Sequence, residues 1–142
     1  MNSLNFQQRM EQTLQIQFGV TIDHASKRQV YEAMMRSVRE ILSQKKFGYE
    51  QELKKRRVKR AYYMSMEFLV GRTLRNNLFN LGIEQEIKTY LSKHHISLDE
   101  IYQIEPDSGL GNGGLGRLAS CYLDALTSQD YPVTGFSILF KI

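Results

Sequence analysis

The sequence predicts an α/β fold, and three observations support this prediction. Residues 60–69 are enriched in aromatic and apolar side chains, which is typical of a strand. Apolar residues recur at helical spacing on both sides of this segment, most clearly over 23–45. Residues 109–117 hold a dense group of glycines directly before another helical pattern. Strands, helices and a glycine loop in this order are characteristic of α/β proteins.

The 142-residue chain has the size and composition of one soluble globular domain, with 42% hydrophobic and 24% charged residues. No window approaches the roughly eighteen consecutive apolar residues of a membrane span, and the first residues lack the apolar core of a secretory signal. Cys121 is the only cysteine, which excludes an internal disulfide and favours the cytoplasm. It falls in the helical pattern after the glycines, so we expect a buried, unreactive thiol.

The net charge of +4 comes from one short basic run. Taking the six positive charges of this run from +4 leaves −2 for the remaining residues; the run consists of Lys54, Lys55, Arg56, Arg57, Lys59 and Arg60. Such a run can mark a nucleic-acid surface. A solvated segment that leads into the following strand is the more common case, and we favour it. We therefore expect no nucleic-acid partner.

The first part of the chain is predicted to be helical. Scattered apolar positions in 1–22, interrupted by Gly19, indicate an amphipathic, weakly helical arm whose docking site is left open. The periodic segment 23–45 predicts a helix with one buried face. Asp23 and Ser26 are its candidate N-caps, because their side-chain oxygens can accept hydrogen bonds from the first free backbone N–H groups.

Further helices and one more strand are predicted after the aromatic strand. Helices are expected over 71–81, with Gly82 as the C-terminal stop, and over 83–93. Ser97 begins a capping-box sequence and predicts another short helix. Residues 133–142 are strand-like. With only two clear strands the sheet would leave open edges, so we expect the chain to be a piece of a larger protein.

Residues 109–117, with the sequence GLGNGGLGR, are the strongest functional signal in the chain. Glycines allow backbone N–H groups to converge on a ligand without obstruction by Cβ atoms. The start of the following helix adds N–H groups without intrahelical acceptors and a partial positive charge. Arg117, in the first helical turn, can add a guanidinium group. The segment therefore predicts an anion-binding loop.

Other interpretations of the glycines are less favoured. Gly109, Gly111 and Gly114 match the dinucleotide pattern G-x-G-x-x-G, which requires a strand immediately before it. The preceding residues are polar and include Pro106, so we disfavour NAD or FAD binding. No Gly-Lys-Ser/Thr follows, which excludes a Walker A loop. A ligand-free turn remains the alternative, although each glycine costs about 0.5–1 kcal/mol of backbone entropy relative to alanine.

Glu67 lies where the aromatic strand should end. Ligand-binding groups gather beyond the carboxyl ends of strands in open α/β sheets, so this carboxylate can bind a sugar hydroxyl or pair with a cation. An ordinary ion pair with Arg72 or with the basic run explains it equally well. His94 and His95 end a helix and have no carboxylate or cysteine at metal-binding spacing, so we expect no metal site.

Residues 59–74 and residues 105–124 together resemble the α-glucan phosphorylases, the family of glycogen, maltodextrin and starch phosphorylases. Residues 59–74, KRAYYMSMEFLVGRTL, are similar to the family's first strand and the turn after it. Residues 105–124, EPDSGLGNGGLGRLASCYLD, are similar to its glycine-loop segment. The resemblance runs from about residue 59 to residue 135. It implies transfer of a terminal glucosyl unit from an α-1,4-glucan to orthophosphate, with glucose 1-phosphate as the product.

The resemblance also implies a fold and a cofactor. The family has a pair of Rossmann-like domains, the GT-B glycosyltransferase fold, with the active site in the cleft between them. Residues 1–58 would then be a helical arm and cap region, and residues 59–142 the incomplete start of the N-terminal α/β domain. The cofactor is pyridoxal 5'-phosphate, whose phosphate group serves in acid–base catalysis. A homodimer is expected at full length.

Position by position, the resemblance implies roles for the glycine loop. Gly113, Gly114 and Leu115 would present backbone donors to the substrate phosphate and the glucosyl unit. Asn112 and Gly114 would lie close to the cofactor, and Glu67 near the same pocket. The lysine that holds pyridoxal phosphate, and most ligands of the glucan and phosphate, belong to a part of the family beyond this chain. We therefore expect no catalytic residue here, and no activity from the chain on its own.

Two other functional hypotheses are kept. One is a non-catalytic product or interaction module that pairs with a full-length subunit. The other, less favoured, is a basic nucleic-acid binder that uses residues 54–60. The glycine loop and Glu67 favour a phosphorylase-related chain over the nucleic-acid binder, because neither feature serves a basic binding surface.

Overall fold

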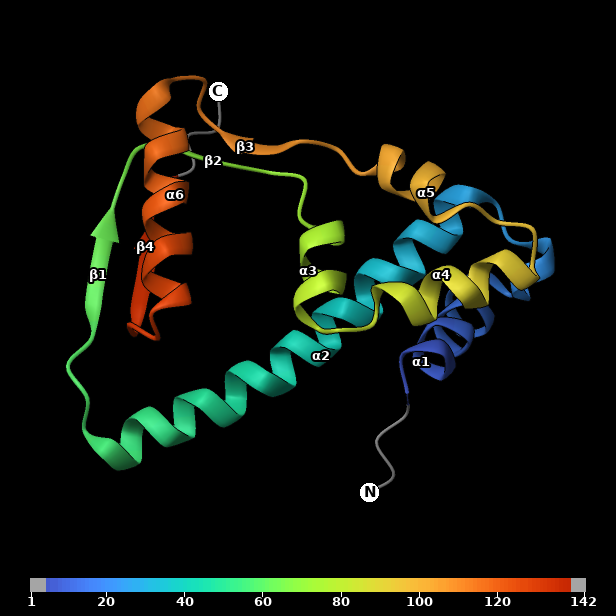
Figure 1. Ribbon diagram of the computed structural model, residues 1–142, viewed down its shortest axis with the longest axis horizontal. Coiled ribbons are helices and arrows are strands. Elements are labelled where there is room, and N and C mark those ends of the chain that lie inside the picture. The colour runs from blue at the N-terminus through green and yellow to red at the C-terminus, as the bar shows by residue number, and fades with distance from the viewer. Residues whose placement is uncertain (1–4, 139–142) are drawn as a thin grey trace. The chain divides into compact units, whose positions relative to one another are not determined.

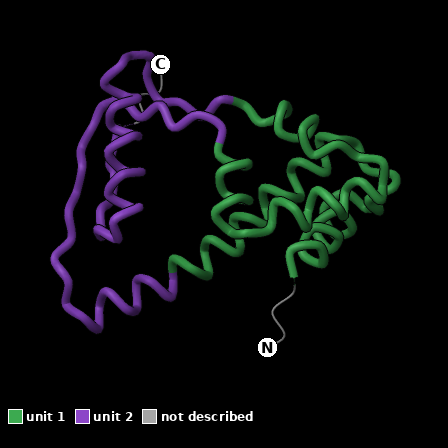
Figure 2. The backbone as a smooth tube through the Cα atoms, in the orientation of Figure 1, with its two compact units in different colours: residues 1–46, 73–106 green, residues 47–72, 107–142 purple. Residues whose placement is uncertain are grey.

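The computed structural model describes residues 5–138, which form a mixed α/β structure of two compact units (Figures 1 and 2). Unit 1 joins residues 1–46 with 73–106, and unit 2 joins residues 47–72 with 107–142. Each unit therefore combines segments that are far apart in the sequence. Compact units need not coincide with the domains of a longer protein, so the expected division into a helical arm and an α/β region stays a prediction.

Unit 1 begins with the arm, which is more regular than its sequence predicted. Its elements are helix α1 (Phe6–Thr13), the π-helix η1 (Leu14–Phe18) and the 3-10 helix η2 (Ile22–His24). Asn5 and Gln8 form a capping box at the start of α1, in which each side chain accepts from the other's backbone N–H. Gly19 ends η1 at φ +65°. Met10 and Leu14 are fully buried, so the arm packs on the core.

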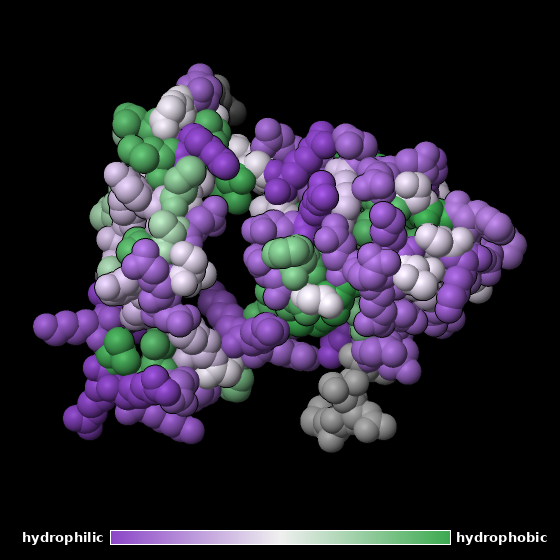
Figure 3. Space-filling model, viewed as in Figure 1, coloured by the Kyte–Doolittle hydropathy of each residue, from purple (hydrophilic) through white to green (hydrophobic). Residues whose placement is uncertain are grey.

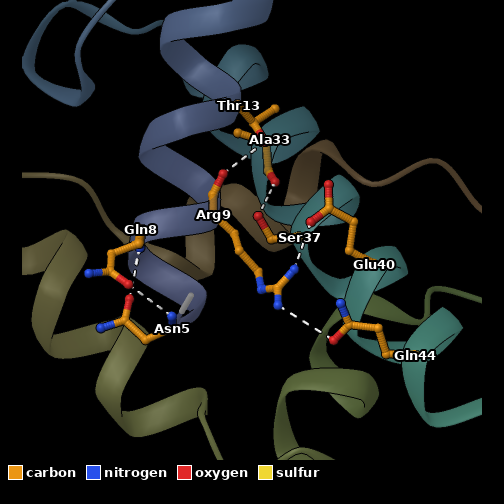
Figure 4. Close-up of polar contacts among 8 residues, drawn as sticks. All are labelled: Asn5, Gln8, Arg9, Thr13, Ala33, Ser37, Glu40 and Gln44. Atoms are coloured by element: carbon orange, nitrogen blue, oxygen red, sulfur yellow. Dashed lines mark hydrogen bonds and ion pairs between the residues drawn. The ribbon is translucent and has the colours of Figure 1, made fainter. Parts of the chain in front are cut away.

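Arg9 docks α1 on the long helix α2 (Lys27–Arg56), as Figure 4 shows. Its guanidinium donates to Glu40 Oε2 at 2.9 Å and to Gln44 Oε1 at 3.5 Å, and its side chain is only 11% exposed. On the buried face of α2, Ser37 Oγ donates to the Ala33 carbonyl at 2.9 Å, which satisfies a buried hydroxyl within the helix. The docking site that the sequence left open is therefore the side of α2.

Helix α2 begins and ends later than the predicted segment 23–45. Of the two candidate N-caps, Ser26 is the one that caps α2. The Gln29 N–H donates to Ser26 Oγ at 3.3 Å, and the Ser26 N–H donates to Gln29 Oε1 at 2.8 Å. Asp23 lies in η2 instead. The helix continues to Arg56 because the added residues are mostly good helix formers, and because cations are favourable near a helix C-terminus.

The basic run is exposed to solvent, as predicted. Its first three residues form the last turn of α2, and Arg60 directly precedes strand β1 (Ala61–Met64). Arg56 pairs with Glu52 at 2.7 Å, and Arg60 pairs with Glu50 at 2.8 Å. The run is therefore a helix end followed by a short solvated connection into a strand.

Three shorter helices complete unit 1: α3 (Leu74–Asn80), α4 (Glu84–Lys93) and α5 (Leu98–Ile104). Gly82, at φ +71°, follows α3 as the predicted stop. The capping box predicted at Ser97 is wrong, because Ser97 makes no side-chain cap and Glu100 pairs with Lys27 at 2.9 Å. The core shared by these helices and the arm includes Met10, Leu14, Val30, Met34, Val38, Leu74, Leu78, Ile87, Leu91 and Ile101.

Glu105 is a buried carboxylate in unit 1, only 4% exposed. It accepts from the Thr73 N–H at 2.8 Å, from the Thr73 hydroxyl at 3.2 Å and from the Leu74 N–H at 3.0 Å. These donors belong to the start of α3, so Glu105 caps that helix from a distant point in the sequence. The burial of its charge is compensated by this set of hydrogen bonds.

Unit 2 contains two small sheets. Strand β1 pairs in parallel with β4 (Val133–Phe136), with Tyr62 opposite Thr134. Strand β2 (Phe68–Gly71) pairs in antiparallel fashion with β3 (Ser108–Leu110), with Gly71 opposite Ser108. The expected strand over 133–142 forms only in part, and its residues 139–142 lie outside the described residues.

The prediction of a single strand over 60–69 is wrong. A turn between Met64 and Phe68 divides it, and the two halves join different sheets. Ser65 stabilises the turn, because its Oγ donates to the Glu67 carbonyl at 2.7 Å and accepts from the Glu67 N–H at 3.2 Å. The helix expected over 71–81 starts only at Leu74, because Gly71 still belongs to strand β2.

Helix α6 (Gly114–Ser128) packs against β2 and β4. Gly116, Ala119 and Ser120 are its buried residues, so a face of small side chains meets the strands. Cys121 is exposed, and the prediction of a buried thiol is wrong. Helical periodicity alone does not show which face of a helix is covered, and the covered face here is set by the small residues.

Large hydrophobic side chains remain exposed in unit 2. Figure 3 shows hydrophobic residues at the molecular surface among hydrophilic ones. Those exposed on or next to β1 and β4 are Tyr62, Met64, Met66, Phe136 and Ile138. An unpartnered face of this kind favours association, because burying apolar surface is favourable in water.

Candidate functional site

The glycine loop connects strand β3 to helix α6, as the sequence predicted for a loop that opens a helix (Figure 1). Gly111 has φ +103°, a conformation that favours glycine, and Gly113 is the N-cap of α6. Strand β3 begins at Ser108 and includes Gly109, so it overlaps the glycine pattern, and residues 105–107 before it do not form a strand, as expected. Strand β3 pairs antiparallel with β2, whereas the dinucleotide pattern requires a parallel β-α-β unit, so this strand does not support NAD or FAD binding.

Glu67 meets the start of α6. Its Oε2 accepts from the Gly113 N–H at 3.2 Å, and its Oε1 accepts from the Asn112 N–H at 3.5 Å. Gly113 and Glu67 are 46 positions apart in the sequence, and the turn between β1 and β2 brings them together. A carboxylate is favourable at this end of a helix, where the dipole is positive. Two backbone N–H groups of the loop are thus occupied by a carboxylate of the same chain, and binding of a ligand anion by the loop stays a prediction.

Glu67 also explains the spacing of the glycines. A Cβ added to Gly111 would lie 2.7 Å from Glu67 Cβ, and one added to Gly116 would lie 2.8 Å from the same atom. A Cβ on Gly113 would lie 2.9 Å from Glu67 Oε2. Carbon atoms do not approach as closely as at Gly111 and Gly116, so these two positions exclude larger residues, whereas at Gly113 the end of the Glu67 side chain would have to move. Gly114 differs, because a Cβ there would meet no atom within 4 Å.

A cavity of about 630 Å³ lies beside the loop. It is lined by Ser65, Met66, Glu67, Leu110, Gly111, Gly113, Leu115 and Ile138. Gly114 and Leu115 are the first two residues of α6, so their N–H groups have no hydrogen-bond acceptor within the helix. Backbone donors, a carboxylate and apolar walls suit a ligand that carries both an anion and hydroxyl groups.

Arg117 does not contribute its charge to the Glu67 contact. Its Nη1 donates to the Leu69 carbonyl at 3.2 Å, which ties the first turn of α6 to strand β2. The predicted site residues Glu67, Gly113 and Leu115 line one cavity, and Gly114 lies between two of them in the sequence. Asn112 is part of the same loop and donates to Glu67.

His94, which follows the last residue of α4, has a structural environment. His94 Nδ1 lies 2.6 Å from Asp23 Oδ1, and this hydrogen bond lowers the pKa of the Asp23 carboxyl below its ordinary value. Within residues 5–138, no three His, Cys, Asp or Glu side chains are grouped so that they could hold a metal ion. Every helix in the same range is too short or too polar to cross a lipid bilayer.

Tyr90 and Tyr102 each donate a hydrogen bond to a carboxylate in unit 1. The Tyr90 hydroxyl lies 2.5 Å from Glu11 Oε1, and the Tyr102 hydroxyl lies 2.9 Å from Glu84 Oε1. Burial, followed by the hydrogen bond to the carboxylate, raises the pKa of both phenols well above their ordinary value. Both side chains therefore remain neutral donors, with a structural role.

Comparison with known proteins gives one consistent family. Residues 91–142 match the family model described as carbohydrate phosphorylase. The chain is 40% identical to glycogen phosphorylase of Bacillus subtilis over 136 residues, and 43% identical to the potato (Solanum tuberosum) alpha-1,4 glucan phosphorylase L-2 isozyme over 111 residues. It is 38% identical to the brain form of glycogen phosphorylase of Bos taurus over 117 residues.

These matches cover most of this chain and little of the relatives. They span 96%, 78% and 82% of the chain, but only 16%, 11% and 14% of the Bacillus, potato and bovine proteins, respectively. An alignment of 136 residues in a chain of 142 includes most of the arm and α2, where the sequence offered no diagnostic motif. The similarity is therefore wider than the two motif segments.

Proposed function

Because this chain belongs to the carbohydrate phosphorylase family, we propose that it forms part of an α-1,4-glucan phosphorylase. In this reaction the bond between C1 of the terminal glucosyl unit and the glucan oxygen breaks, and a bond forms between C1 and a phosphate oxygen. The proton of the phosphate passes to the glucan oxygen, and glucose 1-phosphate leaves. We place this enzyme in the cytoplasm, in keeping with the single cysteine.

The start of α6 is the observation that carries this proposal. By position, Gly113, Gly114 and Leu115 line the site of the phosphate and the glucosyl unit, the backbone donors are those of Gly114 and Leu115, and Glu67 lies at the same pocket. The N–H groups of Gly114 and Leu115 have no intrahelical acceptor, while that of Gly113 donates to Glu67. Oriented N–H groups at a helix start stabilise negative charge without reorganisation during the reaction.

The cofactor of this proposal is pyridoxal 5'-phosphate. The open space at Gly114 and the positive end of α6 fit an anionic group there, and Asn112 and Gly114 are the residues beside it. When bound, the cofactor supplies an acid–base group through its phosphate. The lysine that holds it, like most ligands of the glucan, is proposed to lie beyond residue 142, and this chain contributes no catalytic side chain.

The fold proposed for the full-length enzyme is a pair of Rossmann-like domains, with this chain at the start of the first one and a homodimer as the assembly. The parallel pairing of β1 with β4, and the packing of α6 on β4, support a Rossmann-like arrangement. The exposed hydrophobic side chains of β1 and β4 favour a further covering layer. They are equally compatible with the second candidate, a non-catalytic module that pairs with a complete subunit.

One experiment tests the proposal and separates the two candidates. The full-length protein that contains this chain is purified with pyridoxal phosphate, and the release of glucose 1-phosphate from maltoheptaose and phosphate is measured. The phosphorylase proposal expects turnover that requires both phosphate and the cofactor. A longer protein without turnover, although loaded with the cofactor, would refute it and leave the non-catalytic module.

A further inference from the structure

We propose that Glu67 is a positioning residue of the glycine loop rather than a ligand of the substrate. Its carboxylate engages the N–H groups of Asn112 and Gly113, and thereby aims the next two N–H groups, of Gly114 and Leu115, at the substrate anion. This inference rests on the proposed function, since it assigns the donors of that same site. Its first support is the hydrogen bonding, because one carboxylate binds two successive peptide groups through its two oxygens.

Glu67 is itself held in place. The hydrogen bonds of Ser65 to the Glu67 backbone fix the turn between β1 and β2. Its side chain is enclosed by Gly111, Gly113 and Gly116, where an added Cβ would lie within 2.9 Å of a Glu67 atom. The loop and the side chain therefore fit together closely, and neither can move far without the other. A substrate-binding carboxylate would not need a loop built around its aliphatic part.

The negative charge of Glu67 also favours a positioning role. A carboxylate at the start of α6 offsets part of the positive potential that attracts phosphate. If Glu67 acted by charge alone, its carboxylate would weaken phosphate binding, and removal of this charge would strengthen phosphate binding. If Glu67 acts by geometry, its removal disturbs the alignment of the Gly114 and Leu115 N–H groups and lowers the rate. The two roles thus predict opposite changes in phosphate use.

The test uses the full-length, cofactor-loaded enzyme with Glu67→Gln and Glu67→Asp. The glutamine side chain has only one accepting oxygen for two donors, whereas the aspartate side chain keeps the charge but is one methylene shorter. Both variants are expected to lower kcat/KM for phosphate by up to about 10²-fold, the cost of a misalignment near 1 Å. Asp124→Asn, which removes an exposed carboxylate from the same helix, is the matched control and should leave kcat/KM unchanged.

A second measurement reports directly on how firmly the backbone of the loop is held. Hydrogen exchange of a peptide covering residues 109–117 should be faster in both Glu67 variants than in the wild type and the control, with similar melting temperatures. A lower KM for phosphate at unchanged kcat in Glu67→Gln would overturn the proposal in favour of a charge effect. Normal activity in Glu67→Asp, or lost activity with unchanged exchange, would also overturn it.

The exchange measurement separates this inference from the proposed function. If the wild-type enzyme releases no glucose 1-phosphate, the proposed function fails, yet exchange in the 109–117 peptide still shows whether Glu67 fixes the loop. If the wild type is active and exchange is the same in all variants, the positioning role fails while the proposed function stands. Should Glu67→Gln fail to fold, Glu67→Asp provides both readouts.

Discussion

Gly114→Ala should inactivate the full-length enzyme without destabilising it. The added Cβ meets no atom within 4 Å, and the position is the first of helix α6, where alanine is preferred over glycine by up to about 1 kcal/mol. Stability should therefore be unchanged or slightly raised. Under the proposed function, the methyl group would enter the space through which the phosphate approaches. The loss of one such donor typically costs about 10²–10³ in rate, or about 2.7–4 kcal/mol.

Gly111→Ala is the matched comparison, and its expected result is the reverse. Gly111 has φ +103°, and an added Cβ would lie 2.7 Å from Glu67 Cβ, so strain and overpacking should cost about 1–3 kcal/mol of stability. Gly109→Ala should do less than Gly114→Ala to the rate, since its Cβ meets only the end of the Leu69 side chain, at 3.0 Å.

The assay for these variants combines phosphorolysis kinetics with thermal melting. The reasoning expects Gly114→Ala to separate activity from stability, with a strongly reduced kcat/KM and a melting temperature at or above the wild-type value. A merely structural turn predicts that residual activity follows the folded fraction. A Gly114→Ala enzyme with near-normal turnover would refute the phosphate role of this residue.

Three further predictions concern the chain and its folding. The isolated 142-residue chain should release no glucose 1-phosphate from maltoheptaose with phosphate and pyridoxal phosphate, and turnover above background would contradict this. The same chain should be poorly soluble or partly unfolded, because its strands leave open edges and exposed hydrophobic side chains such as Met64; a monodisperse monomer with a cooperative thermal transition argues against it. Glu105→Ala should lower the urea stability of the full-length protein by about 1–3 kcal/mol, because the buried Leu74 N–H is left without its acceptor. An unchanged urea midpoint would contradict this.

The helices were the most predictable part of the fold, because their buried faces repeat in the sequence. Of the periodic positions of the predicted helix, Val30, Met34 and Val38 are buried, whereas Ile41 is half-buried and Leu42 is exposed. The end of α2 was not predictable from the same signal, since after Val38 the next buried residue of the helix is Leu53. From residue 42 to residue 49 every residue of the helix is exposed, and the helix propensity of these residues favours the helix there.

The strands were harder to predict because pairing is decided by distant residues. The aromatic segment 60–69 has one composition throughout, yet its first half pairs with β4 and its second half with β3. Only Ser65, through its hydrogen bonds to Glu67, marks the turn between the halves, and a single serine is a weak signal in a sequence.

The position of the glycine loop at the start of a helix was predictable from the sequence and is confirmed. That the loop binds a ligand anion stays a prediction, and the structure shows its Gly113 N–H donating to Glu67. No local signal reveals that Glu67 takes the Asn112 and Gly113 donors, because the contact depends on the turn between β1 and β2. The fact that Gly111, Gly113 and Gly116 all face one side chain explains their number in retrospect.

The contact between Glu105 and Thr73 has a consequence for chain topology. Gly71 is paired with Ser108 in the antiparallel ladder, and Glu105 is bonded to Thr73 just beyond it, so the chain runs as a stem of two strands. Helices α3, α4 and α5 are then the loop of an unusually large hairpin. Closing a longer loop costs little more entropy than closing a short one, since the cost grows only with the logarithm of its length. The length of the connections between these helices therefore has little effect on the register of the stem, which the pairs Gly71–Ser108 and Thr73–Glu105 set at its base.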